Sequence, residues 1–480
     1  MSLTGLSATE TSAIRSPFDR RRLLLPALAV VLFGVYTLFE IVRYETGRSS
    51  AYDLGIFTQI VRHYAAGQAP NIGLKQGMNA WGDHFSPVLV LLAPIYRAFP
   101  SPITLLVEQA GLVALSAVPV GRFAARRYGL SAGLLIELAY GISYGLQSMI
   151  AFDFHEVAFA VPILAYALEA LELRSFRRAA VLFSLLVFVK EDLGLTVVVA
   201  GLIIAWNSRR LGLSLVAWGL GWFLLTTTVI VPSFTADGHY RSLNGLTGTG
   251  GITISTLFHP WTIQHLSARA SFVVAALACT GFMALFSRLA AITLPTIAWR
   301  FAASDSNYWS THYHYDAVLM PIIFFAAMDG YPRFARLVMR LLRLRQPNLA
   351  LGRTMIGVTC LAIAILQSWG SYPFWKLLSS DTYRRGSVQN AAMHIANDIP
   401  SGATVQADND IAPWLVSRTT VYAVRQAYGD SPHARWVVLD LTHDTLGASL
   451  VWKRSWASQL STSAERVISD DGIIAIELHS

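Results

Sequence analysis

Apolar runs of about 20 residues recur along this chain, and they constrain its fold more than any other feature. The first run extends from Leu23 to Val42, and others follow as far as Trp369. A helix of this length is what the hydrocarbon core of a bilayer requires. Hydrophobic residues make up 54% of the chain and charged residues only 14%, which excludes an ordinary soluble protein. The sequence therefore predicts a polytopic α-helical membrane protein.

Basic residues gather in short groups beside the apolar runs, which is the pattern of the positive-inside rule. The net charge of +8 therefore indicates membrane topology and argues against a nucleic-acid partner. With Arg20 to Arg22 in the cytoplasm, residues 1–22 form a cytoplasmic tail and residues 23–371 a transmembrane domain of about 11 helices. The external loop at residues 43–100 is expected to carry helices that lie in the membrane interface.

The composition changes after residue 371, and residues 372–480 are expected to form a linker and a small extracytoplasmic α/β domain. The predicted strands are Thr404–Ala407, Thr420–Val424, Trp436–Leu441 and Ile473–Leu478, and the predicted helices are Val388–Asn397, Ile411–Ser417 and Trp452–Leu460. Asp408, Asn409 and Asp410 follow one predicted strand, and Asp440 lies near the end of another. Residues of these types at such positions are more typical of caps and turns than of catalysis.

The external loop at residues 43–100 contains the segments Tyr52-Asp53-Leu54-Gly55 and Trp81-Gly82-Asp83-His84. Leu54 to Ala66 has apolar residues close to helical spacing, which predicts an amphipathic helix in the interface. Asp53 would then lie at the N-terminal end of this helix, where its charge suits the helix dipole. Ionisable side chains at bilayer depth are costly and tend to be kept for a function. We expect this loop to form the edge of an active site.

The predicted topology brings ionisable residues from five separate segments to one face of the membrane. They are Asp53, Asp83, His84, His155, Glu156, Lys190, Glu191, Asp192, His312, His314 and Asp316. Lys190 to Asp192 interrupt an apolar run, and the two short helices on either side would hold the triplet in a recess. Any one of these residues alone is more often a cap or part of a hydrogen-bond network, but their gathering on one face favours a common cavity.

These residue types suit the transfer of a sugar from a lipid phosphate. Such a reaction needs a carboxylate that takes the proton of the acceptor hydroxyl and cations that stabilise the leaving phosphate. Asp53 is the expected catalytic base. The residues expected to face the phosphate are His84, Lys190, His312 and His314, and the supporting polar residues are Asp83, His155, Glu156, Glu191 and Asp192. Asp83, His155 and Glu156 are also the candidates for a divalent cation, whose presence residue spacing does not decide.

A Gly-rich stretch, Gly245 to Gly251, lies in a later external loop. It lacks the Lys-Ser/Thr ending and the preceding strand of a nucleotide P-loop. A flexible loop is therefore favoured over a phosphate cradle.

The segments Tyr52 to Phe57, Gly82 to Pro87, Phe154 to Glu156 and Lys190 to Asp192 resemble the recurrent motifs of a family of predicted bacterial and archaeal membrane proteins, defined only as a domain of unknown function. More distantly, the arrangement is similar to the GT-C superfamily of glycosyltransferases, which use polyprenyl-phosphate sugars. That superfamily places an essential Asp in the first external loop, and the matching residue here is Asp53. The paired acidic form common in that loop is absent, because Tyr52 and Leu54 flank Asp53.

The resemblance implies a GT-C-like glycosyltransferase that acts on the outer face of the bacterial plasma membrane. Its expected partners are a polyprenyl-phosphate sugar donor, a glycan, lipid or protein acceptor, and the lipid bilayer. The main alternative is a transporter or flippase of a lipid-linked or polar substrate, because paired short helices with charged ends also build sites near the bilayer midplane. A third interpretation is a non-catalytic receptor whose external α/β domain is the binding module.

Overall fold

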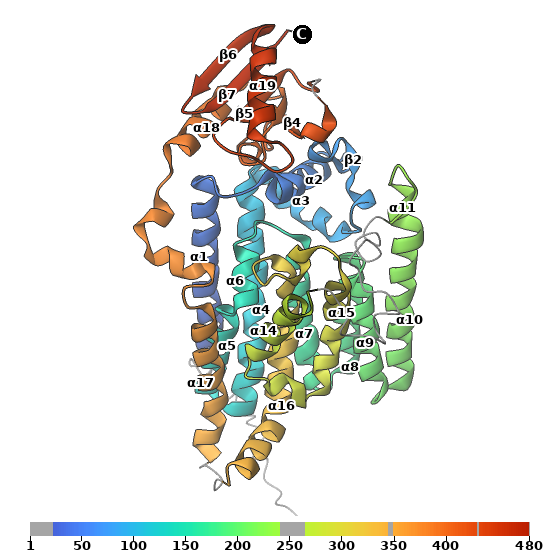
Figure 1. Ribbon diagram of the computed structural model, residues 1–480. Coiled ribbons are helices and arrows are strands. Elements are labelled where there is room, and N and C mark those ends of the chain that lie inside the picture. Colours follow the sequence, from blue (N-terminus) through green and yellow to red (C-terminus); the bar gives the residue numbers. More distant parts are fainter. Residues whose placement is uncertain (1–22, 241–264, 344–348, 430–431, 480) are drawn as a thin grey trace, which may run out of the picture.

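The computed structural model describes residues 23–240, 265–343, 349–429 and 432–479. The chain forms a bundle of helices with a five-stranded sheet at one end (Figure 1). We call this end of the bundle the sheet end and the other the opposite end. The predicted tail at residues 1–22 and the Gly-rich stretch from Gly245 to Gly251 lie outside the described residues.

The first helix leads into a segment that lies between the bundle and the sheet (Figure 1). Its elements are α1 (Leu24–Glu45), a π-helical turn (Ala51–Gly55), α2 (Ile56–Ala65), β1 (Asn71–Ile72), β2 (Met78–Asn79) and α3 (Ala93–Ala98). The predicted helix from Leu54 to Ala66 is confirmed in part, since α2 spans Ile56–Ala65 with Ile60 and Val61 buried and Tyr64 and Ala65 half-buried. Its position in the membrane interface stays a prediction.

The remaining helices run back and forth between the two ends. They are α4 (Pro102–Tyr128), α5 (Leu130–Gly141), α6 (Tyr144–Ile150), α7 (Ala160–Glu172), α8 (Phe176–Ser184), α9 (Leu193–Ala205), α10 (Arg209–Leu225), α11 (Val231–Ser233), α14 (Leu266–Ala278), α15 (Leu294–Ala302), α16 (Leu319–Leu341) and α17 (Leu349–Ser368). Helices α9 and α10 pack through Gly201 and Gly212, where a Cβ would overlap the facing backbone. The polytopic helical architecture follows the hydrophobic pattern of the sequence.

Among the described residues, four helical stretches are long and apolar enough to cross a membrane. They are Leu24–Glu45, Pro102–Tyr128, Arg209–Ser233 and His314–Leu341. Length and composition thus support four spans, against the 11 helices that the hydrophobic pattern predicts, because many of the other apolar helices are short. Helices of this kind are tolerated in membranes where they are buried in protein or line a cavity.

Two predicted helix boundaries were wrong. The run from Leu130 to Ile150 is broken between α5 and α6, and the Tyr36 hydroxyl donates a hydrogen bond of 2.7 Å to the Gly141 carbonyl at the break. The sequence predicts a helix over residues 317–328, but α16 continues through the basic stretch that begins at Arg333 and ends at Leu341. Arg333 bonds Asp329 one turn earlier, and arginine is a good helix former.

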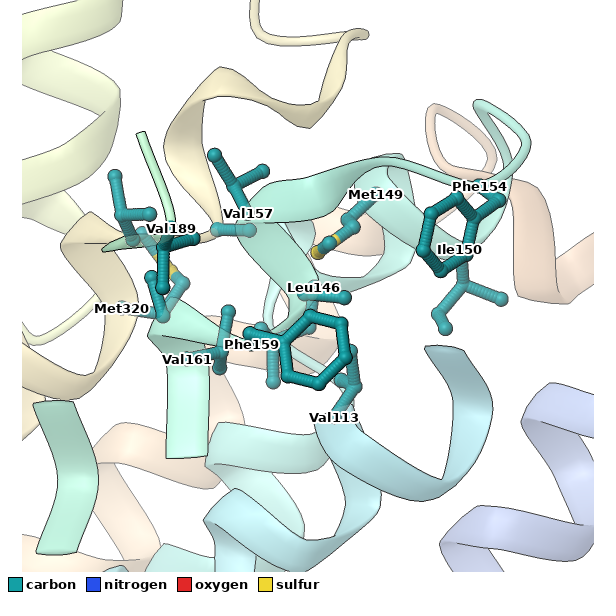
Figure 2. Packing of buried hydrophobic residues seen from close by; sticks show 14 of the residues in the cluster. Val113, Leu146, Met149, Ile150, Phe154, Val157, Phe159, Val161, Val189 and Met320 are labelled. Carbon is teal, nitrogen blue, oxygen red and sulfur yellow. The ribbon is translucent and has the colours of Figure 1, made fainter. Parts of the chain in front are cut away.

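The predicted pair of short helices around Lys190 is confirmed. Helix α8 ends at Ser184 and α9 begins at Leu193, with a tight 3₁₀ turn and the charged triplet between them. The backbone around the triplet rests on apolar side chains: Figure 2 shows Val157, Val189 and Met320 close together beside it. Because apolar packing fixes this layer, the charged side chains above it are held in a defined place.

The sheet is mixed, with the order β4-β3-β5-β7-β6. Its strands are β3 (Thr404–Ala407), β4 (Thr420–Ala423), β5 (Trp436–Asp440), β6 (Ala464–Asp470) and β7 (Ile473–Leu478), flanked by α18 (Ser387–Asp398) and α19 (Leu450–Ser461). Strands β4, β3 and β5 are parallel, so their carboxyl ends share one edge. The loop that follows β3 reaches the segment carrying Asp53.

The sequence predicted four of these five strands and missed β6. Most of β6 is exposed, so it lacks the apolar pattern by which strands are recognised. The predicted helix from Ile411 to Ser417 is only a 3₁₀ turn at Ala412–Trp414, where Pro413 follows two buried residues. The predicted division of the chain at residue 371 stays a prediction.

Candidate functional site

Asp53 lies on the π-helical turn that precedes α2, and the loop after β3 holds this turn in place. The backbone N–H groups of Ala51 and Tyr52 donate to the carbonyl and the side-chain oxygen of Asn409, at 2.8 and 3.1 Å. Such acceptors satisfy N–H groups at a helix start that have no partner within the helix. The loop after β3 therefore caps the turn that carries Asp53.

The Asp53 carboxylate is more open than those of Glu156 and Glu191. Its side chain is 22% exposed, and the His155 Nε2 lies 3.4 Å from its Oδ1. No described residue donates a hydrogen bond to this carboxylate. A partly exposed carboxylate with open lone pairs can accept a proton from a bound hydroxyl.

His155 is positioned by buried polar groups of the bundle. Gln109 on α4 accepts from the His155 backbone N–H at 3.0 Å and donates to the Asp153 carbonyl at 2.8 Å. Gln109 also donates to Glu40 on α1 at 2.7 Å. Three segments are thus joined at one buried amide, which fixes the turn that presents His155 to Asp53.

The His155 ring stacks on the His314 ring, with centroids 3.6 Å apart. Both residues are only 5% exposed, and Phe152 packs against both rings. The Nδ1 atom of each ring is buried without a hydrogen-bond partner among the described residues. Since buried polar atoms are nearly always bonded, these nitrogens are candidates for substrate contacts.

A second group of residues forms ion pairs beside this stack. Lys190 lies 2.8 Å from Glu156, and His84 Nδ1 lies 2.8 Å from Glu191. Glu191 also accepts from the Phe85 backbone N–H at 3.1 Å and from the Tyr240 hydroxyl at 2.8 Å. These contacts tie the segment of residues 83–85 to the break between α8 and α9.

The ion pairs set the charge states of their members. Burial raises the pKa of the Glu191 carboxyl, but the charge and hydrogen bond of His84, with the Lys190 charge, bring it down to about 2. Burial raises the pKa of Asp192 to about 6, and the charges of Glu191 and Glu156 add to this rise against the opposing charges of Lys190 and His84. Burial lowers the pKa of Lys190, but Glu156, Asp192 and Glu191 raise it well above its ordinary value. These neighbouring carboxylates favour the protonated form of Lys190.

Asp83 and Tyr52 lie at the edge of this group. Asp83 pairs with Lys75, and the Lys75 Nζ lies 5.3 Å from the centre of the Tyr52 ring. Arg425 of the sheet domain lies 4.9 Å from the same ring. Two cations thus flank the residue that precedes Asp53.

Two residues of the predicted cluster have other surroundings. His312 is exposed and stacks on Tyr372, at 5.3 Å, rather than on the other candidate residues. Asp316 is fully buried in an ion pair with Arg300, at 2.6 Å. Arg300 also donates to the carbonyls of Tyr308 and Ser310, so the pair holds the loop that presents His314.

The residues proposed for a divalent cation do not converge. Asp83 binds Lys75, Glu156 binds Lys190, and His155 faces Asp53. In the described ranges, no group of three or more His, Cys, Asp or Glu residues is arranged to hold a metal ion. The basic side chains of the site are Lys190, Lys75 and His84, each paired with a carboxylate.

Sequence reasoning missed Gln109, Tyr240 and Arg425, and assigned Asn409 only a turn. Gln109 carried a signal, because a polar residue inside an apolar helix is expected to have a buried partner. Tyr240 and Arg425 carried none, since their contacts join segments that are far apart in the chain.

The comparisons with known proteins agree with this architecture. A family model of predicted membrane proteins, DUF2079, matches residues 43–470. The chain belongs to this family. No curated protein matches the chain at a significant level.

Solved structures of ArnT from Cupriavidus metallidurans are similar to this DUF2079 protein. The structure bound to undecaprenyl phosphate matches with a TM-score of 0.55 and 14% identity, covering 96% of this chain and 98% of ArnT. The apo structure gives the same score and identity, covering 95% and 97%. An oligosaccharyltransferase of Archaeoglobus fulgidus gives a TM-score of 0.41 at 11% identity, a score too low to show a shared fold. At such identities the likeness to ArnT shows a shared fold.

Proposed function

We propose that this protein is a glycosyltransferase of the bacterial plasma membrane that moves a sugar from a polyprenyl-phosphate donor to an acceptor hydroxyl. The observation that carries the proposal is the Asp53 carboxylate, open to a ligand and adjoining the ion pairs of Lys190 with Glu156 and His84 with Glu191. The fold shared with ArnT, which binds undecaprenyl phosphate, supports a polyprenyl-phosphate ligand.

The reaction assigns a task to each half of the site. Asp53 accepts the proton of the acceptor hydroxyl while the hydroxyl oxygen forms a bond to the anomeric carbon of the sugar. The bond from that carbon to the phosphate oxygen breaks, and polyprenyl phosphate leaves. Lys190, with His84 and His314, stabilises the negative charge that develops on the leaving phosphate. His155 orients the Asp53 carboxylate.

The topology of the proposal follows the basic groups of the sequence. The N-terminal tail and the opposite end of the bundle lie in the cytoplasm, and Asp53 and the sheet domain lie outside. Short paired helices complete the transmembrane domain of about 11 helices beside the four long ones. The sheet domain, docked over Asp53 through Asn409, would receive the glycan, lipid or protein acceptor.

The proposal is tested by sugar transfer in membranes. Radiolabelled polyprenyl-phosphate sugars and a panel of acceptors are given to membranes with wild type, Asp53→Asn or the control Asp381→Asn, at equal expression. Asp381 is an exposed acid that pairs only with the exposed Arg384. We expect Asp53→Asn to lose at least about 100-fold in rate, because a general base contributes roughly 10² to 10⁴. Equal transfer by Asp53→Asn and wild type, or none by wild type with any donor, would refute the proposal.

A transporter or flippase is the second candidate, and the break between α8 and α9 favours it. Discontinuous helices with ionisable groups at the break also form substrate sites in transporters. Movement of a fluorescent lipid-linked sugar across proteoliposomes, without transfer to an acceptor, would favour this reading. Transfer without movement favours the enzyme.

A further inference from the structure

A second site lies far from Asp53, at the opposite end of the bundle, where α8 and α10 begin (Figure 1). A cavity of about 620 Å³ opens there between the two helix starts. Its lining residues are Arg174, Ser175, Phe176, Arg177, Ser208, Arg210, Leu211 and Ser214. The lining contains three arginines and three serines and no acidic residue, which suits an anion.

The arginines of this cavity differ from others at the same end. Arg122 and Arg126 share the carboxylate of Glu169, which offsets part of their positive charge. Arg174, Arg177 and Arg210 form no ion pair with any carboxylate of the described residues. Three uncompensated guanidinium groups around one cavity are a phosphate site by charge and by donor geometry.

The serines leave further donors open. Ser175 and Ser208 stand at the cap positions of α8 and α10, and the side chain of neither caps its helix. The first N–H groups of both helices therefore have no side-chain acceptor and add positive potential beside the arginines.

The surroundings of the cavity are apolar. Phe176 and Leu211 belong to its lining, and Leu173, Leu213 and Trp206 nearby in the chain are exposed, Trp206 by 72%. Exposed apolar side chains with an interfacial Trp are typical of the membrane boundary, where acyl chains begin. A ligand that satisfies both parts has a phosphate group joined to acyl chains.

We propose that this cavity binds the headgroup of an anionic phospholipid in the leaflet opposite Asp53. The phosphate lies among Arg174, Arg177 and Arg210, and the acyl chains run along the apolar residues of α10. Basic pockets between transmembrane helices on the cytoplasmic side are suited to anionic headgroups. The site is independent of the chemistry proposed for Asp53.

The test uses the purified full chain in detergent and measures bound phosphatidylglycerol and phosphatidylcholine by native mass spectrometry. The cavity variant is Arg174→Gln/Arg177→Gln/Arg210→Gln. The matched control, Arg336→Gln/Arg340→Gln/Arg343→Gln, removes the same charge from exposed arginines of the same end, at and after the end of α16. Equal melting temperatures without added lipid show that each variant is folded.

We expect wild type and the control to prefer phosphatidylglycerol, and the cavity variant to bind it at least about tenfold more weakly. Soluble glycerol phosphate should not compete. Equal loss in the control would show general attraction to basic residues and overturn the proposal, as would unchanged binding by the cavity variant. Competition by soluble glycerol phosphate at equal concentration would overturn the assignment to a lipid.

Discussion

The two halves of the candidate site hold their ionisable groups in opposite ways. In the paired half, Glu156, Glu191 and Asp83 each lie against a cation and have fixed partners. In the open half, the imidazole of His155 is the only charged partner of Asp53 among the described residues, and the stacked rings of His155 and His314 leave their Nδ1 atoms without partners there. Both halves occupy the same part of the molecule, so burial alone does not explain the difference.

The difference indicates a division of work. Carboxylates that are already neutralised by a buried cation cannot easily accept another proton, as the lowered pKa of Glu191 shows. Asp53 has no such cation against it and is free to meet a substrate. We therefore assign electrostatic stabilisation to the paired half and proton transfer to the open half. The predictions below test this division.

Removal of Lys190 should have the largest effect on stability. Lys190→Met leaves Glu156 buried without its cation, which costs about 3–5 kcal/mol. Thermal unfolding should show a marked fall in melting temperature, and the double variant Lys190→Met/Glu156→Gln should recover part of it. The control Lys376→Met changes an exposed lysine and should have no effect. A folded Lys190→Met of wild-type stability would show that the paired half is not a structural unit.

Removal of the Asn409 side chain should affect the open half by a moderate amount. Asn409→Ala deletes the oxygen that accepts from the Tyr52 N–H, a loss of about 1 kcal/mol or roughly fivefold in kcat/KM. Asn409→Asp keeps an oxygen acceptor but replaces the Nδ2 group that donates to Asp410, so it should restore the rate only in part. The loss should fall on kcat rather than KM, because Asn409 orients Asp53. A fall in melting temperature with unchanged kcat would limit Asn409 to a structural role.

The smallest expected effect is a pH dependence of the stability that the His84–Glu191 pair contributes. Burial and the Lys190 charge lower the pKa of His84, but Glu191 and Asp83 outweigh them, so it lies above the ordinary value of 6.5. Stability from this pair is full below pH 6.5 and is lost as pH rises through the raised pKa. Between pH 6 and pH 9, wild type should lose roughly 1–2 °C more in melting temperature than His84→Gln. The exposed His394 provides the control, and identical pH profiles for wild type and His84→Gln would refute the linkage.

The sequence predicted those features of the two halves that depend on a local pattern of residues. The interfacial helix beside Asp53 and the broken helix at Lys190 both follow from apolar spacing and interrupted runs. The sequence also predicts Asp53, Glu156 and Lys190 on one face of the membrane, since each lies in a segment that the basic groups place outside.

The pairing within the site could not be predicted in this way. Gln109, Asn409 and Tyr240 act through contacts between segments far apart in sequence, which no local pattern encodes. His312 was misplaced because the loop before His314 turns into a 3₁₀ turn, so two histidines that are two residues apart do not face the same way. The cation candidates failed for a similar reason, since each residue found a closer partner on another segment.

The measurement that tests the account most directly separates binding from chemistry at Asp53. Purified wild type and Asp53→Asn in nanodiscs are loaded with a radiolabelled polyprenyl-phosphate sugar, and acceptor is added for a single turnover. We expect Asp53→Asn to bind the donor within about twofold of wild type and to transfer the sugar at least about 100-fold more slowly. Transfer at the wild-type rate, or loss of donor binding together with transfer, would contradict the assignment of Asp53 as the base.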